Sequence, residues 1–450
     1  MEKKMTMDMT TGSPAKLIVR FGLPLLFGSV LQQLYNFVDT IVVGRGISME
    51  ALASVGVTGS LNFLVLGFIM GMAQGVSILV SQFFGSRQPE QMRKSITMSF
   101  WLCYGCGLLV TVLSVIGSRW MLTMMNTPAN IIDDAVVYLH IIFGGTLISL
   151  TYNFLAGILR AVGDSKNPLV AMVIAFVVNT ILDILFVIPL KMGVAGAAYA
   201  TVIAQGVSAV YCLVCVRKIE ALRLHREDWA WNGALFSKSF FLSLPVAIMN
   251  SITAVGVIFL ATAINGYGSD YVAAYSASSK IIVILEQLSS SFGMAVATFA
   301  GQNMGAGKIE RIRSGVRQTN LILMGMNLAS AIIMTLFGRT LLILMVSDSN
   351  AVVLAIALHT LIFQSWFLVA LGLLWVYRCA LQAMGDTFFP MLSGLLEFAA
   401  RTFFIIVLPK LMGFDGVLSA EVSAWISAAL MLGVTFYIRL HHLNKQALAV

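Results

Sequence analysis

The feature that most constrains this chain is a series of apolar stretches, each long enough to cross a lipid bilayer. Residues 21–44 contain one charged side chain, Asp39, and a helix of about 20 residues spans the ~30 Å hydrocarbon layer. Only 11% of the 450 residues are charged, whereas soluble proteins carry about a quarter. Eleven more stretches follow, at residues 52–82, 93–117, 133–160, 168–190, 193–217, 236–265, 272–302, 312–337, 352–382, 388–410 and 415–440. We therefore predict an all-α membrane protein with twelve transmembrane helices.

The basic residues set the predicted orientation of these helices. The chain carries 28 Lys and Arg residues and a formal net charge of +8. Most of them fall in the two termini and in the connections that twelve spans would place on the same side of the membrane. Basic residues concentrate in the cytoplasmic segments of membrane proteins, so we predict that both termini are cytoplasmic. The positive charge follows from this topology, and we expect no nucleic-acid partner.

The chain contains an internal repeat with a nearly constant offset. Pro24 in the first stretch matches Pro245 in the seventh. The Gly-Asp-(Ser/Thr)-x-x-Pro turn at 163–168 matches the turn at 385–390, at almost the same separation along the chain. Because a fixed offset indicates a structural unit that recurs, we predict two pseudo-symmetric six-helix bundles.

The repeat also predicts how the chain divides. An N-terminal six-helix lobe covers residues 1–217, a cytoplasmic inter-lobe loop covers 218–235, and a C-terminal six-helix lobe covers 236–450. Each lobe has an even number of spans, so an axis along the membrane normal should relate the two lobes. Two bundles around a central cleft form an alternating-access architecture, although architecture alone does not establish transport.

Few polar residues lie within the apolar stretches, and an ionisable one is a candidate for function because it costs at least ~2.5 kcal/mol at the bilayer centre. Asp39 lies about five residues, or ~7 Å, from the outer end of the first span. Asp183 lies at a similar depth in the fifth span, and Asn179 is one helical turn away on the same face. We predict a cation-coupling site formed by Asp39, Tyr138, Asn153, Asn179, Asp183 and Thr201.

The second half of the chain does not repeat this polar group. At the offset of the repeat, Leu260 is the counterpart of Asp39, and Arg401 is the counterpart of Asn179. A structural role would more naturally recur in both lobes, so the asymmetry favours a functional site. Two neighbouring carboxylates in an apolar surrounding repel each other, so one can take up a proton. Oxygen ligands also suit Na⁺, and the sequence leaves both ions open. The Na⁺ alternative uses Asp39, Asn179, Asp183 and Thr201.

The second half has charged positions of its own. We assign Glu286, near the middle of the eighth span, and Arg401, in the eleventh span, to a substrate cleft. Glu397 and Arg401 are four residues apart on one helix, and this spacing predicts an ion pair. Glu286 has no partner at helical spacing, so it either contacts substrate or pairs with a residue on another helix.

Two motifs that resemble ligand sites have a structural interpretation. The CxxC pairs Cys103–Cys106 and Cys212–Cys215 lie inside apolar spans, where cysteine acts as a small hydrophobic residue rather than as a zinc ligand. In the turns at 163–168 and 385–390, Gly ends one helix and Asp or Ser/Thr caps the next, with Pro in its first turn.

Together these residues resemble the multidrug and toxic compound extrusion (MATE) family over nearly the whole chain. The resemblance rests on six plus six spans, the Pro24…Asp39 first span and the Asn179-x-x-x-Asp183 spacing. The loop with Gln82 and Gly85, repeated as Gln302 and Gly305, also agrees. The residues predicted for cation coupling match the site of the prokaryotic DinF-like branch. Residues 236–265 lack the acid that the NorM-like and eukaryotic branches carry in the seventh span.

The resemblance implies a secondary active antiporter. Such proteins export cationic or amphipathic small organic molecules, including drugs, in exchange for H⁺ or Na⁺ by alternating access. The implied location is a prokaryotic cytoplasmic membrane. We expect a monomer that contacts membrane lipid and a small-molecule substrate, and that uses no cofactor besides the coupling ion.

Other protein classes fit the sequence less well. A major-facilitator transporter also has six plus six spans, but residues 83–95 lack its usual Asp- and Arg-rich loop. A lipid or polysaccharide flippase of the same superfamily shares the topology and is the main alternative. Flippases for anionic lipid-linked sugars tend to have a strongly basic cavity, whereas Arg401 is the main deeply placed Arg here. The chain lacks HExxH, and residues 305–309 fail the phosphate-loop pattern, so we expect neither an enzyme nor direct use of ATP.

Overall fold

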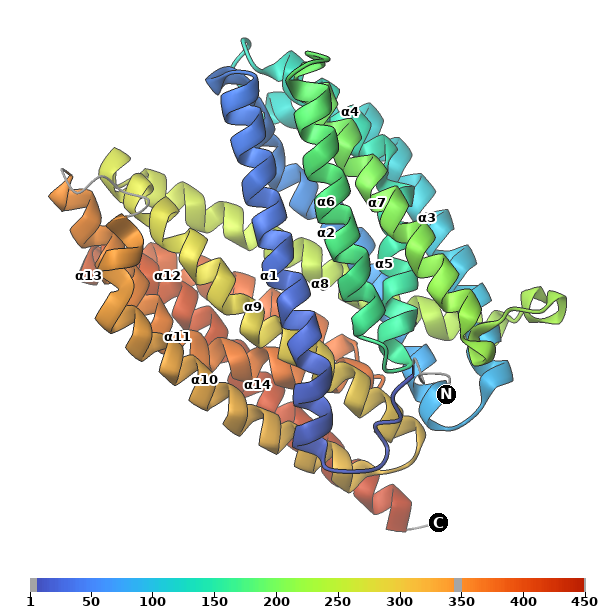
Figure 1. Cartoon of the computed structure of the whole chain (residues 1–450). Helices are drawn as coiled ribbons and strands as arrows, with labels where there is room; N and C mark the ends of the chain where they lie inside the picture. Colours follow the sequence, from blue (N-terminus) through green and yellow to red (C-terminus); the bar gives the residue numbers. More distant parts are fainter. Residues whose placement is uncertain (1–5, 344–349, 449–450) are drawn as a thin grey trace. The chain divides into compact units, whose positions relative to one another are not determined.

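A computed structural model describes residues 6–343 and 350–448, and these ranges are almost entirely helical, without a strand (Figure 1). Helices are expected because a backbone in lipid must satisfy its own polar groups. The helices before the inter-lobe connection are α1 (Pro14–Gly46), α2 (Met49–Gly85), α3 (Pro89–Met124), α4 (Ile132–Gly144), α5 (Thr146–Ala161), α6 (Lys166–Val187) and α7 (Gly193–Lys218). The connection holds two short 3-10 helices, η1 (Glu220–Leu222) and η2 (Arg226–Trp229). The remaining helices are α8 (Gly233–Asn265), α9 (Ser269–Gly305), α10 (Ile309–Ile343), α11 (Ala351–Ala383), α12 (Phe388–Val407), α13 (Pro409–Met412) and α14 (Phe414–Leu448).

The number of possible membrane spans agrees with the prediction. Within the described ranges, eleven helical segments are long and apolar enough to cross a membrane, and α4 and α5 together supply a twelfth span that bends by 44°. The bend lies at Gly144 and Gly145, and adjacent small residues are a common cause of kinks. A Cβ added at Gly145 would lie 2.5 Å from Val202 Cγ2, so α7 approaches the backbone closely at the bend. The predicted stretch 133–160 is therefore a broken helix.

The chain forms two compact units that divide two of the helices between them. The first unit contains Phe27–Ser251 and the described residues before Met9, and the second contains Met9–Leu26 and the chain from Ile252 onward. Consequently α1 begins in the second unit and ends in the first, whereas α8 begins in the first and ends in the second. The predicted lobes, 1–217 and 236–450, follow the sequence repeat and stay a prediction.

The segment before α1 is held in the second unit by polar side chains. Three backbone carbonyl groups between residues 9 and 12 accept hydrogen bonds from side chains of this unit. The donors are Asn303 Nδ2 at 3.1 Å, Lys308 Nζ at 2.8 Å and Arg311 Nη1 at 3.0 Å. Hydrogen bonds from charged donors are stronger than those between neutral groups. These bonds explain why the first part of α1 belongs to the second unit.

The repeated turns adopt the same conformation in both units. Gly163 and Gly385 have φ of 88° and 91°, a region that residues with a Cβ rarely adopt. Asp164 Oδ1 accepts a hydrogen bond from the backbone N–H three residues later at 3.0 Å, and Asp386 Oδ1 does the same at 3.4 Å. The interpretation of these turns as a glycine stop followed by an aspartate cap is therefore confirmed.

The cysteines pack as the sequence predicts. Cys103, Cys212 and Cys215 are buried in the apolar core of the first unit, with residues of α2, α5 and α7 around them. These three cysteines therefore occupy positions where small hydrophobic residues would be expected.

In the first unit, α2 packs closely on α8 through a stripe of glycines. Gly67, Gly71 and Gly75 repeat every four residues along α2. A Cβ added at Gly71 would lie 2.5 Å from the Ala247 Cα, and one at Gly75 would lie 2.2 Å from the Ser243 Oγ. Small residues at this spacing let the backbones of membrane helices approach and make extensive van der Waals contact.

We predict that Gly71→Ala destabilises the protein, because the added methyl group can only be accommodated if α2 and α8 separate. Overpacking of this kind costs about 1–3 kcal/mol. The matched control is Gly59→Ala on the same helix, where an added Cβ meets nothing within 4 Å. Thermal midpoints of the purified variants in detergent, read by size-exclusion chromatography, should fall for Gly71→Ala only. Equal shifts for both variants would contradict the close contact.

Candidate functional site

The C-terminal ends of α1 and α6 meet in the first unit, and each of these helices carries a carboxylate within about two turns of that end. A Cβ added at Gly46, the last residue of α1, would lie 2.7 Å from the Cγ1 of Val187, the last residue of α6. Asp39 precedes the end of α1 by about 10 Å, and Asp183 precedes the end of α6 by about 6 Å, at 1.5 Å per residue. The register of these two helices therefore brings the two predicted acids together.

The side chains of Asp39 and Asp183 interact directly with each other. Asp183 is fully buried and Asp39 is partly buried. Ionised carboxylates only accept hydrogen bonds, so the two can bond only when one carries a proton or a cation lies between them. In the described part of the chain, neither oxygen of Asp183 nor the Oδ1 of Asp39 has a hydrogen-bond partner. The arrangement is therefore suited to taking up one positive charge.

Polar side chains from four helices surround this carboxylate pair. Asn179 is fully buried and lies beside Asp183, one helical turn earlier on α6. Tyr138 of α4 is also buried, within electrostatic reach of both acids. Thr201 of α7 accepts a hydrogen bond from the Tyr35 hydroxyl at 3.1 Å, and Tyr35 lies near both acids. These side chains therefore provide several oxygen atoms that could bind a cation.

Two residues distinguish this group from the predicted site. Asn153 donates a hydrogen bond to the Ser149 carbonyl of its own helix at 2.9 Å, and among the described residues no hydrogen bond joins it to either acid. Tyr35 belongs to the group but was not predicted. It precedes Asp39 by one helical turn on the same face of α1, and this spacing is the signal that would have identified it.

The hairpin between α6 and α7 positions Thr201. Lys191 and Gly193 adopt φ of 50° and 60° and reverse the chain. A Cβ added at Gly196 would lie 3.0 Å from the Phe186 Cβ, so the two helices approach closely just after the turn. The two helices consequently run side by side at the level of the carboxylate pair, and α7 delivers the hydroxyl.

The second unit contains a different charged group. Glu421 of α14 accepts hydrogen bonds from Gln364 Nε2 at 3.0 Å and from the Tyr275 hydroxyl at 3.4 Å. Both Arg401 and Glu286 lie within electrostatic reach of Glu421. We call these five residues the second-unit cluster. The structure thus brings the two predicted cleft residues, Glu286 and Arg401, into one group.

Arg401 is the most enclosed charge of this cluster. It is 3% exposed, and its Nη1 would lie 2.4 Å from a Cβ added at Gly256 of α8. Its Nε has no hydrogen-bond partner among the described residues. Glu421 was not predicted, although it is an acid within the apolar stretch 415–440 and the criterion that selected Glu286 would also have selected it.

Comparison with known proteins now assigns the family. The sequence model of the MatE family matches residues 24–185 and 245–407. The chain belongs to the MatE family. The two matched segments begin at Pro24 and Pro245, the two prolines that mark the internal repeat.

Curated relatives support the same assignment, and solved structures share the fold. The chain is 29% identical over 393 residues to the probable multidrug resistance protein YpnP of Bacillus subtilis, covering 87% of each chain. It is 25% identical over 319 residues to the DNA damage-inducible protein F of Escherichia coli, covering 69% of each chain. A solved structure of MATE in complex with MaL6 superposes with a TM-score of 0.90 at 22% identity, covering 99% of this chain and 100% of that chain. A MOP superfamily transporter from Pyrococcus furiosus gives a TM-score of 0.91 at 22% identity, covering 97% and 98%.

These findings confirm the predicted family and fold class, an all-α membrane protein of two helical bundles. MatE members are transporters rather than enzymes, so this chain is a multi-pass membrane transporter of the multidrug efflux family.

In this MatE chain, the predicted ion pair between Glu397 and Arg401 is wrong. Glu397 pairs instead with Arg378 of α11, and the two side chains are 6% and 5% exposed. Arg378 also donates a hydrogen bond to the Ser393 Oγ at 3.2 Å. Helical spacing identifies residues that can meet on one helix. It does not indicate whether a neighbouring helix supplies a different ion-pair partner. Arg401, one turn further along α12, lies near Glu421 instead.

A double-mutant cycle tests this partnership. Removing one partner of a buried ion pair leaves an uncompensated charge and costs about 3–5 kcal/mol. Glu397→Gln and Arg378→Gln should each lower the free energy of unfolding, and the double variant should lose less than the sum, by about 0.5–3 kcal/mol. Glu397→Gln combined with Arg401→Gln should be additive. Denaturant unfolding in detergent micelles gives the free energy of unfolding of the parent protein, the three single variants and the two double variants. Coupling of Glu397 to Arg401 rather than to Arg378 would refute the assignment.

Proposed function

We propose that this MatE chain is a secondary active antiporter that exports cationic or amphipathic small organic molecules in exchange for H⁺ or Na⁺. Membership in a multidrug efflux family supports export of small molecules. The observation that most supports ion coupling is the carboxylate pair Asp39–Asp183 in the apolar first unit. Among the described residues, the groups that act electrostatically on these two acids include neither Lys nor Arg.

Either coupling ion would remove the repulsion within the pair. A proton on one carboxyl group turns it into a donor, so that the two groups can share a hydrogen bond. Na⁺ would instead take oxygen ligands from Asp39, Asn179, Asp183 and Thr201, and hard cations prefer such ligands. The Asn179 amide oxygen has no hydrogen-bond partner in the described ranges, and the Thr201 hydroxyl retains a lone pair beside the bond from Tyr35.

Coupling requires that the cation-bound and cation-free pair prefer different conformations. That difference in preference is the coupling free energy. Asp39 lies on α1, which the two units share, so a change of charge there acts on an element that belongs to both. We propose that this preference drives alternating access.

The second-unit cluster is our proposed substrate contact. Arg401 and Glu421 carry opposite charges and lie close together, and Gln364 and Tyr275 donate to the Glu421 carboxylate. Arg401 also lies within electrostatic reach of Glu286, so in this cluster one cation faces two carboxylates. A cationic group of the substrate would balance the second carboxylate.

Asp39→Asn tests the coupling site. The amide keeps the size of the side chain but fixes a neutral state, so the pair loses its reason to take up a cation. We expect gradient-driven efflux to fall by about 5- to 150-fold, the range of typical coupling free energies, while the protein stays folded in the membrane. Sealed vesicles with an imposed pH or Na⁺ gradient provide the measurement, and the gradient that drives efflux in the parent protein identifies the ion.

The control for this variant is Asp270→Asn, which neutralises an exposed acid in the first turn of α9 and should leave transport unchanged. Leu260, at the position equivalent to Asp39, is unsuitable because it is 3% exposed in an apolar cluster. Near-normal gradient-driven efflux by Asp39→Asn would mean that the acid is structural, and Glu286→Gln would then be the next variant to measure.

Cysteine labelling tests the proposed topology, in which both termini and the inter-lobe connection are cytoplasmic and the protein lies in a prokaryotic cytoplasmic membrane. Arg226 and Asp270 are both exposed, so a cysteine at either position is accessible to a reagent on its own side. In a background without the five native cysteines, a membrane-impermeant maleimide added to intact cells should label Asp270→Cys and not Arg226→Cys. The reverse pattern would overturn the positive-inside orientation.

A further inference from the structure

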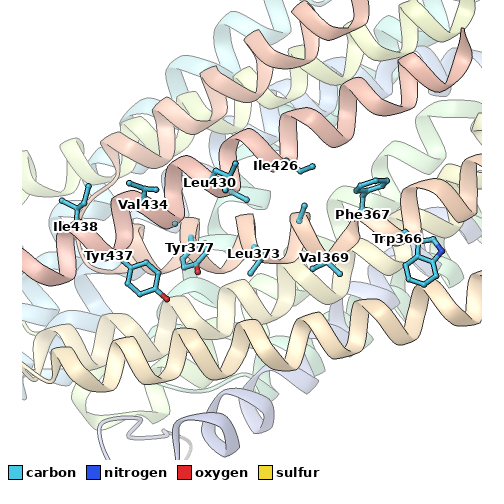
Figure 2. Close-up of a pocket in the computed structure, with 13 residues that line it drawn as sticks. Trp366, Phe367, Val369, Leu373, Tyr377, Ile426, Leu430, Val434, Tyr437 and Ile438 are labelled. Atoms are coloured by element: carbon cyan, nitrogen blue, oxygen red, sulfur yellow. The ribbon is translucent and has the colours of Figure 1, made fainter. Parts of the chain in front are cut away.

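A groove of about 770 Å³ runs along the second unit between α11 and α14 (Figure 2). Its walls are aliphatic and aromatic side chains, spaced three or four residues apart on each helix. Small residues leave the space between them, including Ala370 on α11 and Gly433 on α14. Gly433 lies so close to Tyr377 that an added Cβ would be 3.3 Å from the tyrosine ring.

The groove has the length of one bilayer leaflet. Along α11 the lining residues run from Trp366 to Tyr377 (Figure 2), and these positions are eleven residues apart, which corresponds to about 16 Å of helix. Half of the ~30 Å hydrocarbon layer is about 15 Å. Tyr377 lies six residues before the end of α11, so this end of the groove is the one nearer the membrane surface.

The two ends differ in chemistry. At the surface end, the Tyr377 hydroxyl lies beside the Tyr437 hydroxyl and the Asn320 side chain, and the two tyrosine rings have centroids 6.2 Å apart. Asn320 is 7% exposed, and its Oδ1 has no hydrogen-bond partner among the described residues. Tyrosine hydroxyls are common at the headgroup level of membranes, where they contact polar lipid groups. The rest of the groove offers hardly any polar atom.

The outer lip of the groove is open and apolar. Leu430 and Val434 are 65% and 60% exposed, and Trp366 is 45% exposed. Water gains little in a recess with so few polar partners, and an empty recess loses the dispersion contacts of its walls. Both helices are of membrane-spanning length. Hydrocarbon from the bilayer is therefore the natural filling.

We propose that this groove binds one acyl chain of a phospholipid. The tyrosine hydroxyls donate to the ester carbonyl, and the methyl end of the chain reaches toward Trp366. The assignment does not depend on the coupling site of the first unit, so it stands or falls separately from the proposed antiport.

Photolabelling in lipid nanodiscs tests this assignment. The probe is a phosphatidylcholine with a diazirine near the end of one acyl chain, and mass spectrometry maps the adducts. We expect adducts on α11 and α14 near Trp366 and Ile426 that saturate at a low mole fraction of probe. Leu109 and Leu113 of α3, 60% and 61% exposed, serve as a reference surface. Adducts there should rise linearly with the probe, as for ordinary bilayer contact.

Two kinds of variant complete the test. Ala370→Phe fills the groove and should abolish the saturable labelling, whereas Ala370→Ser keeps the groove open and should retain it. The combined Tyr377→Phe and Tyr437→Phe variant removes the donors without adding bulk, and should weaken occupancy by about twofold to tenfold, as expected for a lost hydrogen bond. It also keeps the proposal testable if Ala370→Phe does not fold.

Two results would overturn the proposal. Groove labelling that rises linearly and is indifferent to Ala370→Phe would mean that only bulk lipid touches this face. Displacement of the label by tetraphenylphosphonium, a lipophilic cation, would mean that the groove holds transported compounds rather than phospholipid.

Discussion

An ionised carboxylate within an apolar span must be compensated, because neither lipid nor apolar side chains replace its hydration. The structure does this in three ways. Glu397 has a complete ion pair with Arg378. Glu421 has two neutral donors and lies near Arg401. The first unit has two acids that face each other, Asp39 and Asp183, and protein groups leave this pair incomplete. Among the described residues nothing completes this pair, so a cation from solution could supply the counter-charge, and for this reason we propose the pair as the site of ion coupling.

The internal repeat shows that backbone and chemistry follow different constraints. Gly196 allows α7 to pack tightly on the end of α6, and Gly416 allows α14 to pack tightly on the end of α12. An added Cβ would lie 3.0 Å from Phe186 and 2.4 Å from Leu408, respectively. Asp39 and its counterpart Leu260 share no chemistry, and Leu260 packs in an apolar cluster. Glycines at close approaches cannot change without moving helices, whereas a side chain within a bundle can change once its neighbours change with it. One half could therefore acquire a charged site while both kept the same fold.

Much of the fold and part of the site could be predicted because the relevant signals are local. Apolar length defines the spans, and depth along a helix places Asp39 and Asp183 at one level. The partner of Glu397 could not be predicted, because Arg378 comes from another helix and every apolar span offers a similar surface to its neighbours. The same limit applies to the division of α1 and α8 between the units. Two residues that were not predicted could have been. Tyr35 follows from its one-turn spacing to Asp39, and Glu421 follows from being an acid within an apolar stretch.

The anchoring of α1 explains how a local change of charge can matter to the whole chain. At its start, cationic and amide side chains bind the preceding backbone in the second unit. At its end, Gly46 packs against Val187 in the first unit. Pro24 lies two residues before the point where α1 passes from one unit to the other, and proline removes a backbone hydrogen bond from the helix. A helix that is fixed at both ends and weakened between them yields at the weak point. In the coupling that we propose, uptake of a cation by Asp39 therefore acts on a helix whose start is bound by hydrogen bonds in one unit and whose end packs in the other.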